Sequence, residues 1–155
     1  MKKLLIVFVS LIALALGFGL NQYLATDFEV LNGKAHKWRS SEGKWTVVNY
    51  FAEWCAPCLR ELPELNDFHH QYGTSIRLFA VSYDTLSVDE LLGLKQKYDI
   101  HFPVISLLKT LPWQQAPSSL PTTFILDPKG AVVTQLKGEQ SAAKLKQTID
   151  KLQSL

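Results

Sequence analysis

One segment restricts the fold of this chain more than any other: a strand pattern, two cysteines and a helix pattern follow one another directly. Residues 46–51 read TVVNYF, a β-branched and aromatic run that predicts a buried strand. Cys55 and Cys58 come next. Apolar residues then recur at helical spacing up to Gly73, namely Leu59, Leu62, Leu65, Phe68 and Tyr72. A buried strand that leads into an amphipathic helix predicts an α/β domain, with both cysteines near the N-terminus of the helix.

The two cysteines have the spacing and the setting of a redox-active pair. Free backbone N–H groups and the positive end of the helix dipole favour the thiolate of Cys55, which is the attacking species in disulfide exchange. Cys58, one turn further and more deeply buried, would then resolve the mixed disulfide. Ala56 and Pro57 tune the redox potential, since Pro57 restrains the turn and lacks a backbone donor. We expect Trp54 to form an apolar platform beside the thiol.

Other uses of the cysteine pair stay open at this point. A purely structural disulfide is one, and ligation of Cu(I) by two soft sulfurs is another. Two cysteines exclude a Cys-rich scaffold, a zinc finger and an iron–sulfur cluster held by four thiolates. The histidines show no ligand spacing, so we predict no further metal site; they are His36, His69, His70 and His101.

Strand and helix patterns alternate along the middle of the chain. Residues 27–45 are polar and rich in turn residues, which predicts short edge strands or a hairpin. Residues 76–83 predict a second buried strand. A capping box at 87–90 opens a helix to about Tyr98, and residues 102–105 are a candidate for a short strand.

The last third of the chain predicts a β-hairpin and a terminal helix. Residues 123–126 and 132–136 flank a tight-turn sequence, and Ser141 caps the last helix. Two prolines limit any helix in 106–119 to a turn or two. Taken together, the patterns predict one α/β domain over residues 27–155, with a mixed central sheet flanked by helices.

An uncharged apolar run precedes this domain. Residues 4–25 carry no charge and follow Lys2 and Lys3. The run is long enough to cross a hydrocarbon core of about 30 Å, so we predict that residues 1–26 are a cytoplasmic tip and an uncleaved transmembrane signal-anchor. A cleaved signal peptide and a buried core helix remain as alternatives. The two lysines hold the N-terminus in the cytoplasm, which places residues 27–155 on the far side of the membrane.

The charge of the chain gives no reason to expect nucleic acid as a partner. There are 16 Lys and Arg residues against 14 Asp and Glu residues, a net charge of +2. Lys2 and Lys3 account for all of this excess, so the rest of the chain is formally neutral. A nucleic-acid-binding domain would carry a basic patch instead.

Two longer motifs resemble the thioredoxin superfamily, and in particular its membrane-anchored TlpA/ResA-like branch. They are VVNYFAEWCAPCLRELPEL at 47–65 and LPTTFILDPKG at 120–130. The resemblance implies a thioredoxin-like fold with an N-terminal β extension and a helix–strand insertion at 87–105. It implies that Pro121 follows a cis peptide bond and lies against the Cys pair, so that the backbone of Leu120 is free to pair with a bound substrate. Pro63 matches the position where the active-site helix of the family kinks.

The same resemblance implies roles for two polar residues near the Cys pair, Asn49 and Glu61. Asn49 stands where thioredoxin has a buried aspartate, which removes the usual proton acceptor for the resolving thiol. Glu61 stands where ResA-like proteins carry a functional glutamate near the thiols. We expect Glu61 to take over proton transfer, provided that partial burial raises its pKa. Glu53 is a competitor, although a place beside Trp54 in a surface loop favours a solvated carboxylate.

The predicted function is therefore an extracytoplasmic thiol–disulfide oxidoreductase that reduces disulfides in protein substrates. The redox-active pair needs no further cofactor and no metal. The resemblance implies a single-pass anchor in a bacterial inner membrane, with the C-terminal domain in the periplasm or on the extracytoplasmic face. As in the relatives that the resemblance implies, a membrane electron donor of the DsbD or CcdA type would reduce the pair again, and we expect a monomer. A disulfide oxidase or isomerase, a copper-binding or copper-delivery protein, and a thiol peroxidase on the same fold are the alternatives.

Overall fold

The computed structural model describes residue 14, residues 25–40 and residues 42–154. The described elements are β1 (Phe28–Val30), β2 (Ala35–His36), β3 (Trp45–Phe51), α2 (Ala56–Tyr72), β4 (Ile76–Ser82), α3 (Val88–Lys97), β5 (Ile105–Leu108), β6 (Thr122–Leu126), β7 (Val132–Lys137) and α4 (Ala142–Gln153). Within this part of the chain, no helix has the length and apolar character needed to cross a membrane. The predicted anchor at residues 4–25 lies almost wholly outside the described residues.

A four-stranded mixed sheet forms the centre of the fold, in the order β4-β3-β6-β7. β3 and β4 are parallel, whereas β6 is antiparallel to both β3 and β7. The parallel pair is joined by α2, as the strand–cysteine–helix pattern predicted. The predicted hairpin is also confirmed, since β6 and β7 are joined by a turn in which Gly130 adopts a φ of 86°.

A second, smaller antiparallel sheet lies beside the predicted mixed central sheet. Its order is β2-β1-β5, so the polar segment before β3 forms the expected hairpin and then recruits β5. β5 spans 105–108, three residues later than the predicted strand at 102–105. Pro103 has no N–H to give to a ladder, and only Val104 bridges to Ala80 of β4. The two sheets are therefore linked at one residue pair rather than continuous.

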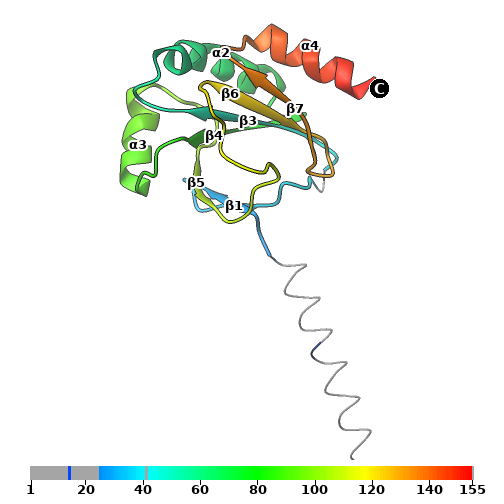
Figure 1. The fold of residues 1–155 in the computed structure, drawn as a ribbon, viewed down its shortest axis with the longest axis horizontal. Coiled ribbons are helices and arrows are strands. Elements are labelled where there is room, and N and C mark those ends of the chain that lie inside the picture. Colours follow the sequence, from blue (N-terminus) through cyan, green and yellow to red (C-terminus); the bar gives the residue numbers. More distant parts are fainter. Residues whose placement is uncertain (1–13, 15–24, 41, 155) are drawn as a thin grey trace, which may run out of the picture.

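Helices cover one face of the central sheet and the small sheet covers the other (Figure 1). α2 and α4 lie together on the first face, where Leu62, Leu65 and Leu145 belong to one buried cluster with the Cys pair. The helix limits follow the expected signals: Ser87 forms the capping box of α3 and Ser141 caps α4. Together with the strands, this confirms an α/β fold with a mixed sheet and three described helices.

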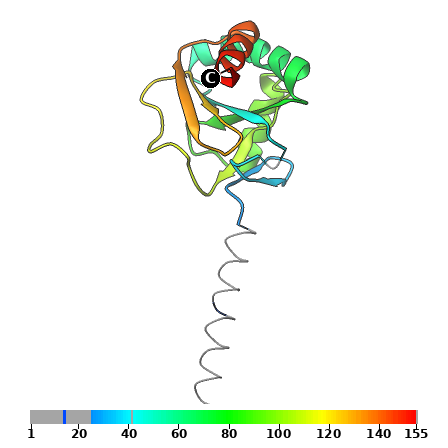
Figure 2. The same ribbon diagram turned by 90° about the vertical axis from the view of Figure 1, so that its right-hand side faces the viewer.

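The segment at 106–119 contains the end of β5 and then a long loop without a helix, which runs along one side of the molecule (Figure 2). Trp113 fastens this loop to the central sheet. Its ring stacks on Phe124 with 4.6 Å between ring centres, and it meets Tyr50 and Trp38 edge-on. An aromatic cluster therefore replaces the helical turn that the sequence allowed.

Candidate active site

Cys55 and Cys58 form a disulfide at the N-terminus of α2. Cys55 is the N-cap residue, and its Sγ accepts a hydrogen bond from the backbone N–H of Cys58 at 3.3 Å. Ala56 and Pro57 occupy the first two helical positions, where a missing proline N–H costs nothing. Cys55 is 5% exposed and Cys58 is fully buried, the order of burial that an attacking and a resolving thiol require.

Glu61 lies one turn beyond Cys58 on the same face of α2, and only 2% of its surface is exposed. Each carboxylate oxygen has a partner from a distant part of the chain. Asn49 Nδ2 of β3 donates to Oε1 at 2.7 Å, and the backbone N–H of Gln140 donates to Oε2 at 2.9 Å. The structure thus brings together Asn49 and Glu61, the two residues to which the resemblance gave linked roles.

Burial raises the pKa of Glu61 from 4.5 to about 7, even though the bonds from Gln140 and Asn49 pull it down. The carboxyl is consequently able to gain or lose a proton near neutral pH. The amide of Asn49 suits both states, because its Oδ1 is buried and has no partner among the described residues. If the amide turns by 180°, Oδ1 can accept the proton of a neutral Glu61.

The Leu120–Pro121 peptide bond is cis, as the resemblance implied. The carbonyl of Pro121 accepts a hydrogen bond from Gly138 N–H at 2.9 Å. No described residue hydrogen-bonds to the backbone of Leu120. Leu120 packs against both buried clusters, so its backbone is held in place while its polar groups stay available.

Trp54 and Glu53 precede the Cys pair at the surface. Trp54 is 66% exposed, and its indole N–H donates to Asp84 Oδ2 at 2.9 Å. Glu53 is also exposed and accepts bonds from Lys97 and Tyr98, which lower its pKa. Glu53 therefore stays a charged surface carboxylate, as expected, and Glu61 alone of the two has a pKa near 7.

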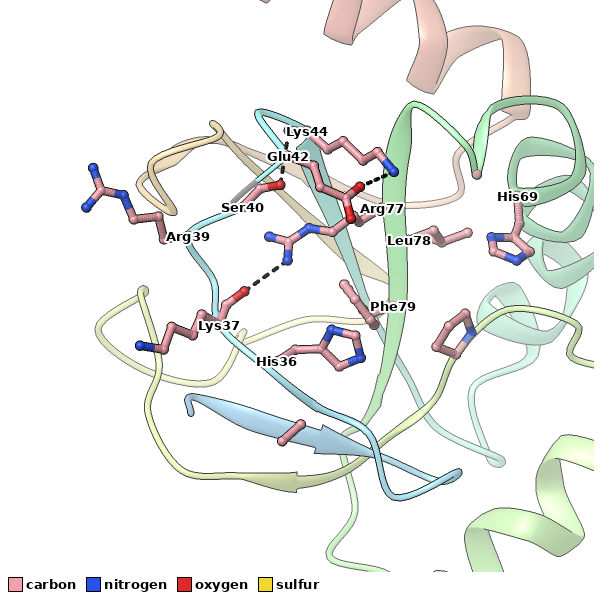
Figure 3. Close-up of a pocket in the computed structure, with 13 residues that line it drawn as sticks. His36, Lys37, Arg39, Ser40, Glu42, Lys44, His69, Arg77, Leu78 and Phe79 are labelled. Atoms are coloured by element: carbon pink, nitrogen blue, oxygen red, sulfur yellow. Dashed lines mark hydrogen bonds and ion pairs between the residues drawn. The ribbon is translucent and has the colours of Figure 1, made fainter. Parts of the chain in front are cut away.

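A cavity of about 420 Å³ lies at the other end of the sheet and takes no part in this site (Figure 3). It adjoins Arg77 near the start of β4, which pairs with Thr46 in the parallel register. Cys55 follows Phe51 at the far end of β3. Five residues of strand separate Thr46 from Phe51, which is about 17 Å.

The charged side chains that point into this cavity already have partners within the protein. Arg77 donates to Thr46 Oγ1 at 2.8 Å and to the carbonyl of Lys37 at 2.9 Å, and Glu42 forms an ion pair with Lys44. Figure 3 shows the side chain of Arg39 pointing away from the others. Arg77 thus ties the segment before β3 to β4, which is a structural role.

A model described as the AhpC/TSA family matches residues 22–142. The chain belongs to the AhpC/TSA family. Among the members that it resembles, the thiol-disulfide oxidoreductase ResA of one Bacillus cereus strain is 30% identical over 132 residues, which cover 84% of this chain and 74% of ResA. The thioredoxin-like protein YneN of Bacillus subtilis is 28% identical over 130 residues, which cover 81% and 76% of the two chains.

Solved structures show that the chain has the thioredoxin-like fold. StoA from Bacillus subtilis superposes with a TM-score of 0.64 at 22% identity, covering 78% of this chain and 92% of StoA. A thiol:disulfide interchange protein from Chlorobium tepidum gives a TM-score of 0.63 at 21% identity, covering 82% and 93%.

Two residues that bind Asn49 or Glu61 in this AhpC/TSA member were not predicted from the sequence. Gln140 binds Glu61 through its backbone N–H, and Thr123 Oγ1 accepts a second bond from Asn49 Nδ2 at 3.1 Å. Both partners lie more than 70 residues away from the groups that they bind. A backbone N–H carries no residue signature, so no sequence signal could have pointed to Gln140.

Proposed function

We propose that this chain reduces disulfide bonds in extracytoplasmic protein substrates, using the dithiol form of Cys55 and Cys58. The observation that carries the proposal is the arrangement of the pair at the N-cap of α2 with a buried carboxyl of pKa about 7 one turn behind it. ResA, a named thiol-disulfide oxidoreductase with which the chain shares most of its length, supports the same chemistry.

The reaction is a two-step exchange. The Cys55 thiolate attacks one sulfur of the substrate disulfide, so that a mixed disulfide forms and the second substrate sulfur leaves as a thiolate, which takes up a proton. The Cys58 thiolate then attacks the Cys55 sulfur, and the remaining substrate thiolate leaves. One substrate disulfide gains two electrons and two protons, while the Cys pair is oxidised to the Cys55–Cys58 disulfide.

Glu61 serves the second step. Cys58 is buried and must lose a proton before it attacks, and Glu61 is a buried carboxyl on the same helix face. Asn49 and Gln140 position Glu61. Ala56 and Pro57 tune the potential of the pair, while Trp54 and the backbone of Leu120 beside Pro121 bind the substrate chain.

The oxidised pair needs an electron source. We place residues 4–25 in the inner membrane as a single-pass anchor and the folded domain, a monomer, in the periplasm, where a membrane dithiol donor of the DsbD or CcdA type supplies two electrons for each turnover. Cell fractionation tests this placement. A periplasmic, soluble form that lacks the first 25 residues would contradict the anchor and support a cleaved signal peptide.

Substitution of each cysteine tests the mechanism. The purified full-length Cys58→Ala protein should accumulate mixed disulfides with its substrates, because the second step is lost. Cys55→Ala should abolish the acceleration of insulin reduction above the rate with dithiothreitol alone, because the attacking thiol is gone. Insulin reduction faster than the dithiothreitol background in Cys55→Ala would end this proposal.

The direction of exchange is tested separately, by equilibration of the pair with glutathione buffers. A reductase should have a potential nearer to the thioredoxin value of about −270 mV, whereas a value near about −120 mV would identify an oxidase. Stoichiometric Cu(I) binding without disulfide turnover would favour the copper-delivery alternative.

A further inference from the structure

Several exposed apolar side chains of the described residues gather at one cavity, which Trp54 connects to the Cys pair. Tyr83, Leu107 and Leu111 are 44%, 49% and 43% exposed, and all three line one cavity of about 410 Å³. Trp54 packs edge-on against Tyr83 with 6.1 Å between the ring centres. We call these four side chains the apolar shelf. Single exposed apolar side chains are common on protein surfaces, whereas a cluster of several large ones is typical of an interaction surface.

The fold makes this shelf continuous with the active site. The bridge between Ala80 and Val104 sets the loop after β4 beside β5. The bond from Trp54 to Asp84 then fixes the same loop to the residue that precedes Cys55. The shelf therefore extends from Trp54, the residue before the attacking cysteine, across the loop after β4 to β5 and the residues after it.

The cavity that the shelf borders has almost no charged lining residues. Asp84 is the one charged residue among the described residues that line the cavity, and its Oδ2 is already bound by Trp54. The other lining groups are aliphatic, aromatic or hydroxyl side chains. Such a lining gains free energy by covering apolar surface and offers no counter-charge to an ionic ligand.

We propose that the apolar shelf binds apolar side chains that flank the cysteine of an extended substrate polypeptide, and so selects disulfides in unfolded or partly folded chains. The inference rests on the proposed function and names the substrate class of that site. In the mixed disulfide, the substrate is covalently held at Cys55, so the residues beside its cysteine meet Trp54 and then the shelf. A folded protein keeps those apolar residues in its own core and cannot offer them.

Two disulfide peptides that differ only beside their cysteines test the proposal. One carries Leu and Phe within three residues of each cysteine, and the other carries Ser and Gln there. The purified full-length protein, with dithiothreitol as reductant and its direct reaction subtracted, should have a kcat/KM about tenfold higher for the apolar peptide. The double variant Leu107→Gln/Leu111→Gln should remove this preference, lowering kcat/KM for the apolar peptide about tenfold.

Two controls separate the shelf from general effects. Val133→Gln changes an equally exposed apolar residue, on β7, and should leave the peptide preference unchanged. A small aromatic disulfide, 5,5′-dithiobis(2-nitrobenzoic acid), cannot span the shelf. The pre-reduced double variant, freed of dithiothreitol, should therefore reduce it in a single turnover at a rate within twofold of that of the unaltered protein.

Each other outcome overturns the proposal in its own way. Equal kcat/KM for both peptides would show that flanking apolar residues are not recognised. Conversion of a dimer to a monomer by the double variant would identify the shelf as an interface between copies of the chain. If the unaltered protein neither accelerates the reduction of the peptides above the dithiothreitol background nor reduces the small aromatic disulfide when pre-reduced, the proposed function itself is refuted, whatever the shelf does.

Discussion

At the residue scale, the fold sets the pKa of the Glu61 carboxyl and therefore its protonation near neutral pH. Its pKa of about 7 lies above the 4.5 of an exposed carboxyl because burial disfavours the ionised form. The contribution of Glu61 to stability is therefore fully present below pH 4.5, declines as the pH rises, and is lost above about pH 7. The difference of roughly 2.5 pKa units corresponds to about 3 kcal/mol of unfolding free energy.

Glu61→Gln should remove this pH dependence. Between pH 4.5 and 7.5 the unaltered disulfide form should lose about 3 kcal/mol through this one group, and the variant should not, because an amide does not titrate. Urea denaturation at the two pH values measures the difference. Glu53→Gln, which changes an exposed carboxylate, should behave like the unaltered protein. An unchanged pH dependence in Glu61→Gln would contradict the raised pKa.

The same variant tests proton transfer. Only ionised Glu61 can accept the Cys58 proton, so kcat for disulfide reduction should rise through about pH 7 in the unaltered protein. Glu61→Gln should lose this rise and be about 100-fold slower at pH 8, the lower end of the range for general bases. Stopped-flow measurement of mixed-disulfide resolution isolates the step. A variant that is slow but keeps the rise near pH 7 would assign the titration to another group.

At the element scale, α3 depends on its N-terminal cap. The Ser87 hydroxyl accepts from the backbone N–H of Glu90 and the Glu90 carboxylate accepts from the backbone N–H of Ser87. Ser87→Ala should lower the free energy of unfolding by about 1 kcal/mol, because a helix N–H loses its partner. Chemical denaturation measures the change. Ser118→Ala, in the exposed loop, should have no effect, and an equal loss there would argue against the cap.

At the scale of the whole molecule, one aromatic residue holds loop and sheets together. Trp113 stacks on Phe124 of the central sheet and touches Trp38, which also packs on Phe28 of the small sheet. Trp113→Ala should cost about 3–5 kcal/mol, the usual result of removing a buried aromatic ring. Trp113→Phe keeps a ring on Phe124 and should lose clearly less. Equilibrium unfolding of both variants gives the comparison, and equal losses would show that the stack does not matter.

The sequence was most informative where signals are local. Four features were predictable because each depends on residues within a few positions. They are the strand before Cys55, the caps at Ser87 and Ser141, and the turn before β7. Resemblance added the cis bond before Pro121.

Long-range contacts were out of reach. The division into two sheets depends on the pairing of β1 with β5. The hydrogen bond from Gln140 to Glu61 depends on the position of the segment just before α4 relative to α2. The loop at 106–119 depends on the ring of Trp113 finding Phe124. None of these has a local pattern, because each joins segments that only the complete fold brings together.

The antiparallel pairing of β1 with β5 also fixes where a tether would be attached. Phe28 lies opposite Leu108, and Asp27 binds the backbone of Lys109, at the edge that carries Leu107 and Leu111. If residues 4–25 lie in a bilayer, as proposed, the short tether before Asp27 keeps Cys55 within a thin layer above the lipid. A donor in the same bilayer would then be present at a high effective concentration, whereas a protein far from the membrane would rarely encounter Cys55.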